Sequence, residues 1–140
     1  MRKPVNNYTI SWGVGVPRSR YCDNAVGNYS PSIGISQDQS DWETKARRNG
    51  NSDNLPRDVR LAEGDFLGFR ILDSLTHAGR KRMEFFVNDH MLHAYNDVEW
   101  NPAFVLMATP CVDCRYRIVP GMSFSSSVFT FDFIFCVIDY

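Results

Sequence analysis

Two apolar runs in the middle of the chain decide the fold class. The first reads Glu63-Gly64-Asp65-Phe66-Leu67-Gly68-Phe69-Arg70-Ile71, and the second reads Met83-Glu84-Phe85-Phe86-Val87-Asn88-Asp89-His90-Met91-Leu92. Both are rich in aromatic and branched residues and are bounded by turn formers, which is typical of β-strands. The second run predicts a hairpin in which residues 83–87 pair with residues 91–95 through a tight turn at Asn88-Asp89-His90.

Strand patterns recur on both sides of these runs. Residues 8–16 alternate large apolar side chains with small ones, and residues 32–36 and 115–119 predict short strands. Residues 103–108 form a continuous apolar run, which predicts a strand buried on both faces. No window longer than ten residues shows a helical period. The sequence therefore predicts an all-β fold, a two-sheet antiparallel β-sandwich.

Two segments leave alternatives open. Residues 37–58 are long and polar, with strong turn chemistry at Asn49-Gly50, so they form either a functional loop or a loop that hides a short strand around Trp42. Residues 122–140 are apolar and contain no basic residue. They are interpreted either as the final core strand or as a non-native extension of a domain that spans residues 1–121. The second alternative would leave the sandwich incomplete.

Composition limits the classes of function. The chain has 140 residues, 44% of them apolar and 14% aromatic, which indicates one globular domain. Its formal net charge of −1 favours neither nucleic acid nor an anionic membrane. Asp132 and Asp139 interrupt the apolar tail, and the N-terminus has no apolar signal region. We expect a cytoplasmic or nuclear protein that is not secreted.

The runs quoted above resemble a SPRY domain, and almost equally the Neuralized homology repeat. The pattern from Glu63 to Phe69 is similar to the acidic/Gly-Asp-apolar strand of the SPRY family, and Met83 to Asp89 to its Phe-x-x-Asn hairpin. Ser32-Ile33-Gly34-Ile35-Ser36 and Trp100-Asn101-Pro102-Ala103-Phe104-Val105 resemble two further strands of that family. The resemblance covers roughly residues 32–119, and Asp89 stands where the family has a turn glycine.

The resemblance implies a concanavalin-like jelly roll and a non-enzymatic adaptor. Such a domain holds a peptide or a protein surface with loops at one end of the sandwich, often in ubiquitin-ligase or signalling proteins. Loops on a rigid scaffold carry recognition, and Arg, Tyr and Trp dominate interface energies. By residue type and expected exposure, we predict a partner-binding set that comprises Arg18, Tyr21, Trp42, Arg47, Arg48 and Trp100.

Two alternatives compete with an adaptor. His90-x-x-His93 and Cys111-x-x-Cys114 are residue types that build tetrahedral zinc sites, although residues i and i+3 of a strand point to opposite faces. A carbohydrate-active sandwich would need two carboxylates across a cleft. The candidates are Glu84, Asp89, Asp97 and Glu99, which form no tight cluster in the sequence. No nucleophile motif or phosphate loop is present, so we predict no enzyme activity and no cofactor.

Overall fold

The described part of the chain forms ten β-strands in two antiparallel sheets. The computed structural model describes residues 9–17, 25–38, 40–56, 58–62, 64–109, 115–120 and 131–139, and for the last two stretches it describes the backbone. The first sheet contains, in spatial order, β4 (Asn51–Leu55), β3 (Thr44–Arg48), β2 (Ser32–Asp38), β1 (Thr9–Gly15) and β8 (Val105–Thr109). The second contains β7 (His90–Val98), β6 (Lys81–Val87), β5 (Phe66–Asp73), β10 (Phe131–Asp139) and β9 (Arg115–Pro120).

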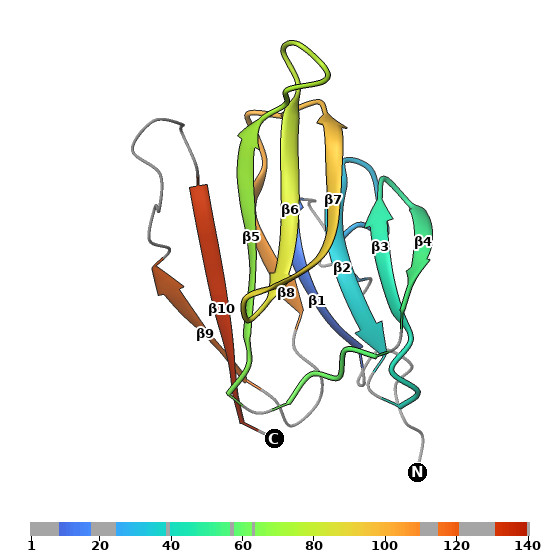
Figure 1. The fold of residues 1–140 in the computed structure, drawn as a ribbon, viewed down its shortest axis with the longest axis vertical. Helices are drawn as coiled ribbons and strands as arrows, with labels where there is room; N and C mark the ends of the chain where they lie inside the picture. Colours follow the sequence, from blue (N-terminus) through green and yellow to red (C-terminus); the bar gives the residue numbers. More distant parts are fainter. Residues whose placement is uncertain are drawn as a thin grey trace.

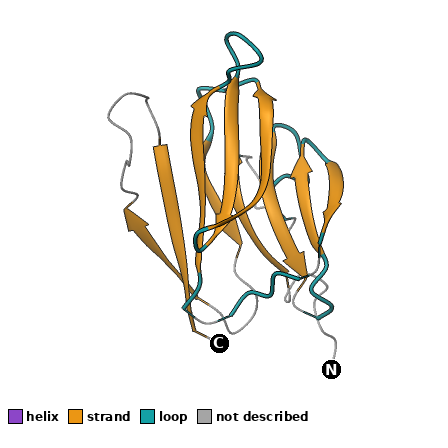
Figure 2. Cartoon of the chain, viewed as in Figure 1, coloured by secondary structure: helices purple, strands orange, loops and turns teal. Residues whose placement is uncertain are grey.

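These two sheets confirm the predicted all-β antiparallel sandwich (Figures 1 and 2). No described residue lies in a helix. The apolar side chains of β1 and β2 face those of β5 and β6 and form one buried core. Trp12, Phe69 and Phe85 are its largest members, each at most 2% exposed. Trp12 also joins the sheets directly, because its indole N–H donates to the Gly68 carbonyl at 3.0 Å.

The small residues of β1 and β2 serve the opposite face of the first sheet. Ser11 and Gly34 lie on that face, where the segment of residues 25–31 packs over them. The Val26 N–H donates to Ser11 Oγ at 3.1 Å, and a Cβ on Gly34 would lie 2.8 Å from Val26 Cγ1. This cover explains why β1 and β2 are buried on both faces although only one face looks into the sandwich.

The predicted hairpin is present as β6 and β7. Val87 pairs with His90 across a two-residue turn, and Asn88 adopts a φ of 53°, a conformation that asparagine tolerates better than most residues. Residue Leu92 is extra on β7, since Phe86 pairs with Met91 and Phe85 with His93. This bulge shifts the alternation along β7.

The polar segment of residues 37–58 contains two strands, β3 and β4, so the alternative of a hidden strand is the correct one. The strands form a hairpin closed at Asn49-Gly50, with positive φ at both residues. Trp42 itself lies in the preceding turn, with a φ of 62°. The polar composition of β4 reflects its place at the edge of the sheet, where four of its five residues are exposed.

Two other expectations change. The prediction that residues 103–108 are buried on both faces is wrong: β8 begins at Val105, which is 44% exposed, because this strand lies at the edge of the first sheet. In the tail, residues 131–139 form β10, which pairs with both β5 and β9 inside the second sheet. The backbone of residues 131–139 therefore belongs to the second sheet.

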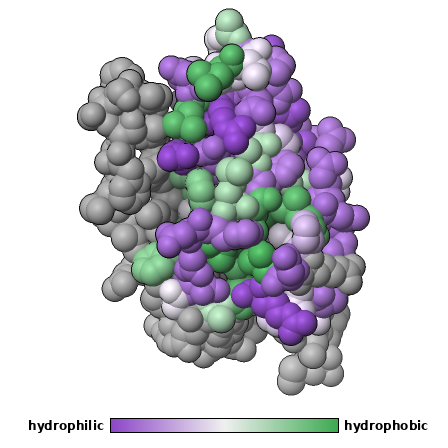
Figure 3. Space-filling view, viewed as in Figure 1, coloured by the Kyte–Doolittle hydropathy of each residue, from purple (hydrophilic) through white to green (hydrophobic). Residues whose placement is uncertain are grey.

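The two ends of the sandwich differ. The connection between β4 and β5 crosses one end, the lower end in Figure 1, and the Gln37 side chain fixes it by donating to the Val59 carbonyl and accepting from the Leu61 N–H. The opposite end gathers the β3–β4 turn, the β5–β6 connection and the loop after β7. Over the face seen in Figure 3, hydrophilic side chains are interleaved with hydrophobic ones in the described part of the chain.

Candidate functional site

A cleft of about 560 Å³ lies at the end of the sandwich where β3 and β7 finish. Its wall combines residues from both sheets with residues from the loop after β7. The floor is apolar and the rim is polar. The lining residues are Pro31, Ile33, Arg48, Asn49, Arg80, Asp97, Val98, Glu99, Trp100, Asn101, Pro102 and Phe104.

The β3–β4 turn fixes one side of the cleft. Asn49 and Gly50 adopt the left-handed backbone that this tight turn requires, with φ of 52° and 88°. The Asn49 side-chain oxygen accepts from the Ser32 N–H at 3.1 Å, and the Asn49 N–H donates to the Ser32 carbonyl at 2.9 Å. The turn is thereby tied to the start of β2, and Arg48, which precedes it, is held at the mouth of the cleft.

The loop after β7 supplies an aromatic wall. The Asn101 side-chain oxygen accepts from the Ala103 N–H at 2.9 Å, and the Asn101 carbonyl accepts from the Phe104 N–H at 3.0 Å. This tight turn brings Phe104 back to Trp100, whose rings meet edge to face with centroids 5.0 Å apart. Both side chains are partly buried and pack on the core, so the wall has a fixed shape.

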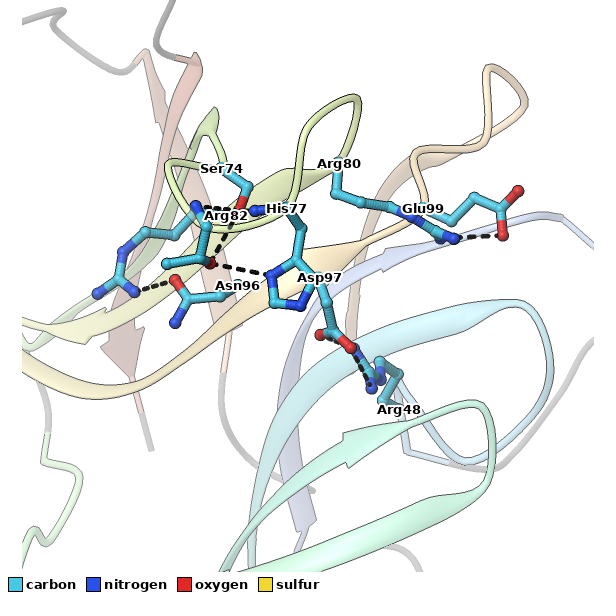
Figure 4. Close-up of polar contacts among 9 residues, drawn as sticks. Arg48, Ser74, His77, Arg80, Arg82, Asn96, Asp97 and Glu99 are labelled. Atoms are coloured by element: carbon cyan, nitrogen blue, oxygen red, sulfur yellow. Dashed lines mark hydrogen bonds and ion pairs between the residues drawn. The ribbon is translucent and has the colours of Figure 1, made fainter.

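Two ion pairs form the rim (Figure 4). Arg48 donates through both terminal nitrogens to Asp97, at 2.6 Å and 3.4 Å, and its guanidinium also lies 4.9 Å from the centre of the Tyr95 ring. Arg80 contacts Glu99 at 3.2 Å, with both side chains largely exposed. The rim therefore carries two positive and two negative charges.

Ion pairing and burial shift the pKa values of four groups in and near the cleft. The hydrogen bond from Arg48 lowers the pKa of Asp97, and the same bond raises the pKa of Arg48. Burial raises the pKa of Tyr95 to about 12, with a further contribution from the negative charge of Asp53. Burial lowers the pKa of His93, whose ring contacts Tyr95 edge to face at 4.6 Å.

The structure brings together two of the six predicted partner-binding residues, Arg48 and Trp100. Arg47 is on the opposite face of β3, where its Nε donates to Ser36 Oγ at 2.8 Å and its Nη1 donates to Asn28 at 3.2 Å. Trp42 lies at the other end of β3, with the Arg60 guanidinium 5.5 Å from its ring. Arg18 and Tyr21 lie outside the described residues. Arg47, Arg48 and Trp42 therefore lie at three different places in the fold.

Sequence reasoning missed Phe104, Asn49, Arg80 and Asp97 as cleft residues. Two signals were available: the Asn49-Gly50 dipeptide predicts a turn next to Arg48, and Trp100-Asn101-Pro102 predicts a chain reversal that would return an aromatic residue. Neither signal says which turns meet in space. That information resides in the packing of the two sheets, which brings Arg48 of β3 into contact with Asp97 of β7.

The zinc alternative remains a prediction. His90 is at the exposed start of β7, whereas His93 turns inward opposite Phe85. Cys111 and Cys114 lie outside the described residues, and among the described ones no three His, Cys, Asp or Glu side chains form a metal-binding group. Metal analysis of the purified chain tests it: one equivalent of zinc that is lost in Cys111→Ser would support a zinc site.

The carboxylates considered for carbohydrate chemistry are distributed over several places. Glu84 is on the outer face of the second sheet, bound by Arg70 and Arg82. Asp89 is in the β6–β7 turn. Asp97 and Glu99 do line the cleft, and each is paired with an arginine. A glycan array with a hydrolysis readout tests whether that pair acts on sugars.

Comparisons with protein-family models, curated proteins and solved structures found no match to this chain. Within the part of the chain that the structure describes, no helix has the length and apolar character needed to span a bilayer.

Proposed function

We propose that this chain is a non-enzymatic protein–protein interaction module that binds a peptide or a protein surface in the cleft beside Arg48 and Trp100. The proposal agrees with the resemblance to SPRY domains, which implies recognition by loops at one end of a sandwich. The same resemblance suggests a ubiquitin-ligase or signalling context.

The observation that carries the proposal is the aromatic wall of the cleft. Trp100 and Phe104 are held edge to face on a rigid core, yet both still line an open cleft of about 560 Å³. Tryptophan and arginine are the residue types that most often dominate binding energy at interfaces. A wall of fixed shape binds with little loss of side-chain entropy, because the rings are already ordered before a ligand arrives.

The protonation of the rim supports binding over acid–base catalysis. A general acid or base works best with a pKa near the working pH. The Arg48–Asp97 pair moves both pKa values away from the working pH, since the pKa of Asp97 is lowered and that of Arg48 is raised. Both groups therefore keep their charges near pH 7, which suits them to orient a ligand.

A peptide-display selection on the intact chain tests the proposal. Selected peptides should bind the unaltered chain and lose at least about tenfold in affinity with Trp100→Ala, as expected for a truncated aromatic anchor. Arg48→Ala should give a smaller loss. Phe66→Ala is the matched control, because Phe66 is an aromatic residue that is 44% exposed and does not line the cleft.

Circular dichroism and thermal unfolding establish that each variant is folded before affinities are compared. Selected peptides that bind Trp100→Ala and the unaltered chain equally well would reject the cleft as the binding site. So would a selection in which Phe66→Ala causes the larger loss.

A further inference from the structure

The cleft presents more free hydrogen-bond donors than acceptors. Among the residues that the structure describes, the Trp100 indole N–H has no hydrogen-bond partner, and neither do the side-chain amide N–H groups of Asn49 and Asn101. In both asparagines the side-chain oxygen is already used: the one in Asn49 accepts from Ser32, and the one in Asn101 accepts from Ala103. The amide N–H groups are therefore the unused polar groups that these two side chains offer to a ligand.

The carboxylates of the cleft, by contrast, already accept hydrogen bonds from arginines. Both oxygens of Asp97 are bound by Arg48, and one oxygen of Glu99 accepts from Arg80. A ligand rich in N–H groups would share these carboxylates with the arginines, whereas a ligand rich in carbonyl groups meets donors that have no partner among the described residues. The same pairs leave the rim without net charge, so neither a strongly acidic nor a strongly basic peptide is favoured.

The apolar lining of the cleft combines prolines, aromatic rings and buried aliphatic side chains. The prolines and rings are Pro31, Pro102, Trp100 and Phe104, and the buried aliphatic residues are Ile33 and Val98. The Trp100 and Phe104 rings meet edge to face at an interplanar angle of 78°. Flat, rigid apolar groups such as pyrrolidine rings fit surfaces of this kind without losing rotamer freedom.

On the basis of the proposed function, we propose that the natural ligand is a proline-rich segment of a partner protein in the left-handed polyproline II conformation. Such a segment has solvent-exposed carbonyl acceptors, and its prolines carry no N–H that would require an acceptor. It is ordered before binding, so the entropy loss on association is small. Its chemistry complements a cleft with unused donors, carboxylates that are already paired with arginines, and an aromatic wall.

Fluorescence polarisation with a labelled decaproline peptide tests the inference on the full chain. The all-L peptide should bind at least about tenfold more tightly than its all-D mirror image, which has the same composition and the opposite helical hand. A glycine–serine peptide of equal length provides a second control.

Three variants test the indole N–H, the whole Trp100 side chain and the Asn101 amide separately, and a fourth serves as the control. Trp100→Phe keeps a ring and removes the indole N–H, so decaproline affinity should fall about fivefold, the value of one hydrogen bond. Trp100→Ala should lower it at least about tenfold. Asn101→Asp keeps the oxygen that the Ala103 N–H needs and removes the free amide donors, so it should also weaken binding several-fold. Phe66→Ala should bind decaproline unchanged.

The results distinguish this inference from the proposed function. Equal binding of the L and D peptides, or no effect of Trp100→Ala on decaproline binding, overturns the polyproline assignment. If display then selects peptides without proline that still depend on Trp100, the interaction module stands with a different ligand. If no selected peptide depends on Trp100, both proposals are wrong.

Discussion

The core between the sheets and the cleft at their end each use a tryptophan, in opposite ways. Trp12 is fully buried, and its indole N–H is satisfied by the Gly68 carbonyl of the facing sheet. Trp100 is partly buried, contacts Phe104, and has an indole N–H without a partner among the described residues. The first side chain is surrounded by its own protein, and the second is partly exposed in the cleft.

This difference teaches how one residue type can serve stability or recognition. Burial of an aromatic side chain contributes to folding in proportion to the apolar area removed from water. Where the protein covers all of that area and satisfies the polar atom, nothing remains for a ligand. Where the protein covers only part of the apolar area and leaves the polar donor unused, a ligand can gain binding energy by covering the rest and accepting from that donor.

The largest expected effect compares these two residues directly. Trp12→Ala should reduce the free energy of unfolding by about 3–5 kcal/mol, since it leaves a cavity between the sheets and an unsatisfied Gly68 carbonyl. Trp100→Ala should cost less, about 1–2 kcal/mol, because its side chain is only partly buried. Urea unfolding measures both. Similar losses for the two variants would remove the distinction between core and cleft.

A second test compares two loops that both contain a glycine with positive φ. A Cβ on Gly27 would lie 2.5 Å from both the Cβ and the carbonyl oxygen of Arg47, whereas a Cβ on Gly79 would meet nothing within 4 Å. Gly27→Ala should therefore cost about 2–4 kcal/mol from strain and crowding, and Gly79→Ala about 1 kcal/mol from φ alone.

Thermal unfolding of these two glycine variants gives the comparison. A loss for Gly79→Ala that equals the loss for Gly27→Ala would mean that the loop of residues 25–31 is not tightly packed on the first sheet.

A third test compares a buried acid with an exposed one. Burial raises the pKa of Glu84, but hydrogen bonds from Arg82 and Arg70 outweigh it, so the pKa is lowered overall. At pH 7 Glu84→Gln should cost about 1–3 kcal/mol, whereas Asp97→Asn, in a half-exposed pair, should cost about 0–1 kcal/mol.

The pH dependence of the Glu84 effect follows from the direction of the shift. Because the folded-state pKa is below the unfolded one, the stabilisation is complete above the unfolded value and is lost as the pH falls through the folded value. The difference between the unaltered chain and Glu84→Gln should shrink in acid. A difference that grows on acidification would contradict the lowered pKa.

The smallest expected effect concerns His93, which lies on β7 opposite Phe85. Burial lowers its pKa from the ordinary value of 6.5. As the pH falls below about 6.5, the unfolded chain takes up a proton that the folded chain refuses, so stability decreases. His93→Gln should flatten this slope in unfolding curves, and His90→Gln, at the exposed start of the same strand, should keep it. An unchanged slope in His93→Gln would contradict the lowered pKa of His93 as its cause.

Much of the fold could be predicted from local pattern. The hairpin of β6 and β7 follows from alternating apolar residues around Asn88-Asp89, and the strand at residues 66–73 follows from its aromatic alternation. The hairpin of β3 and β4 was obscured by polar composition, because an edge strand has little apolar surface to bury. The edge position of β8 was missed for the complementary reason: apolar residues at an edge look like a buried strand.

The site was less predictable than the fold. Arg47 and Arg48 are adjacent in the sequence and are the same residue type, yet alternation along β3 sends one to Ser36 and Asn28 and the other to Asp97 and the cleft. Sequence alone gives the alternation but not which face opens to solvent. Arg80 joins the cleft from the connection between β5 and β6 of the other sheet, a proximity that follows from how the two sheets pack together.

The sequence by itself determined that the chain forms antiparallel strands and where most of them begin and end, because strand propensity and turn chemistry act between near neighbours. Only the tertiary structure decided which strands lie side by side, which face of each is covered, and that Arg48 and Trp100 share a cleft. Those outcomes depend on pairing and packing between residues far apart in the chain, which local pattern does not encode.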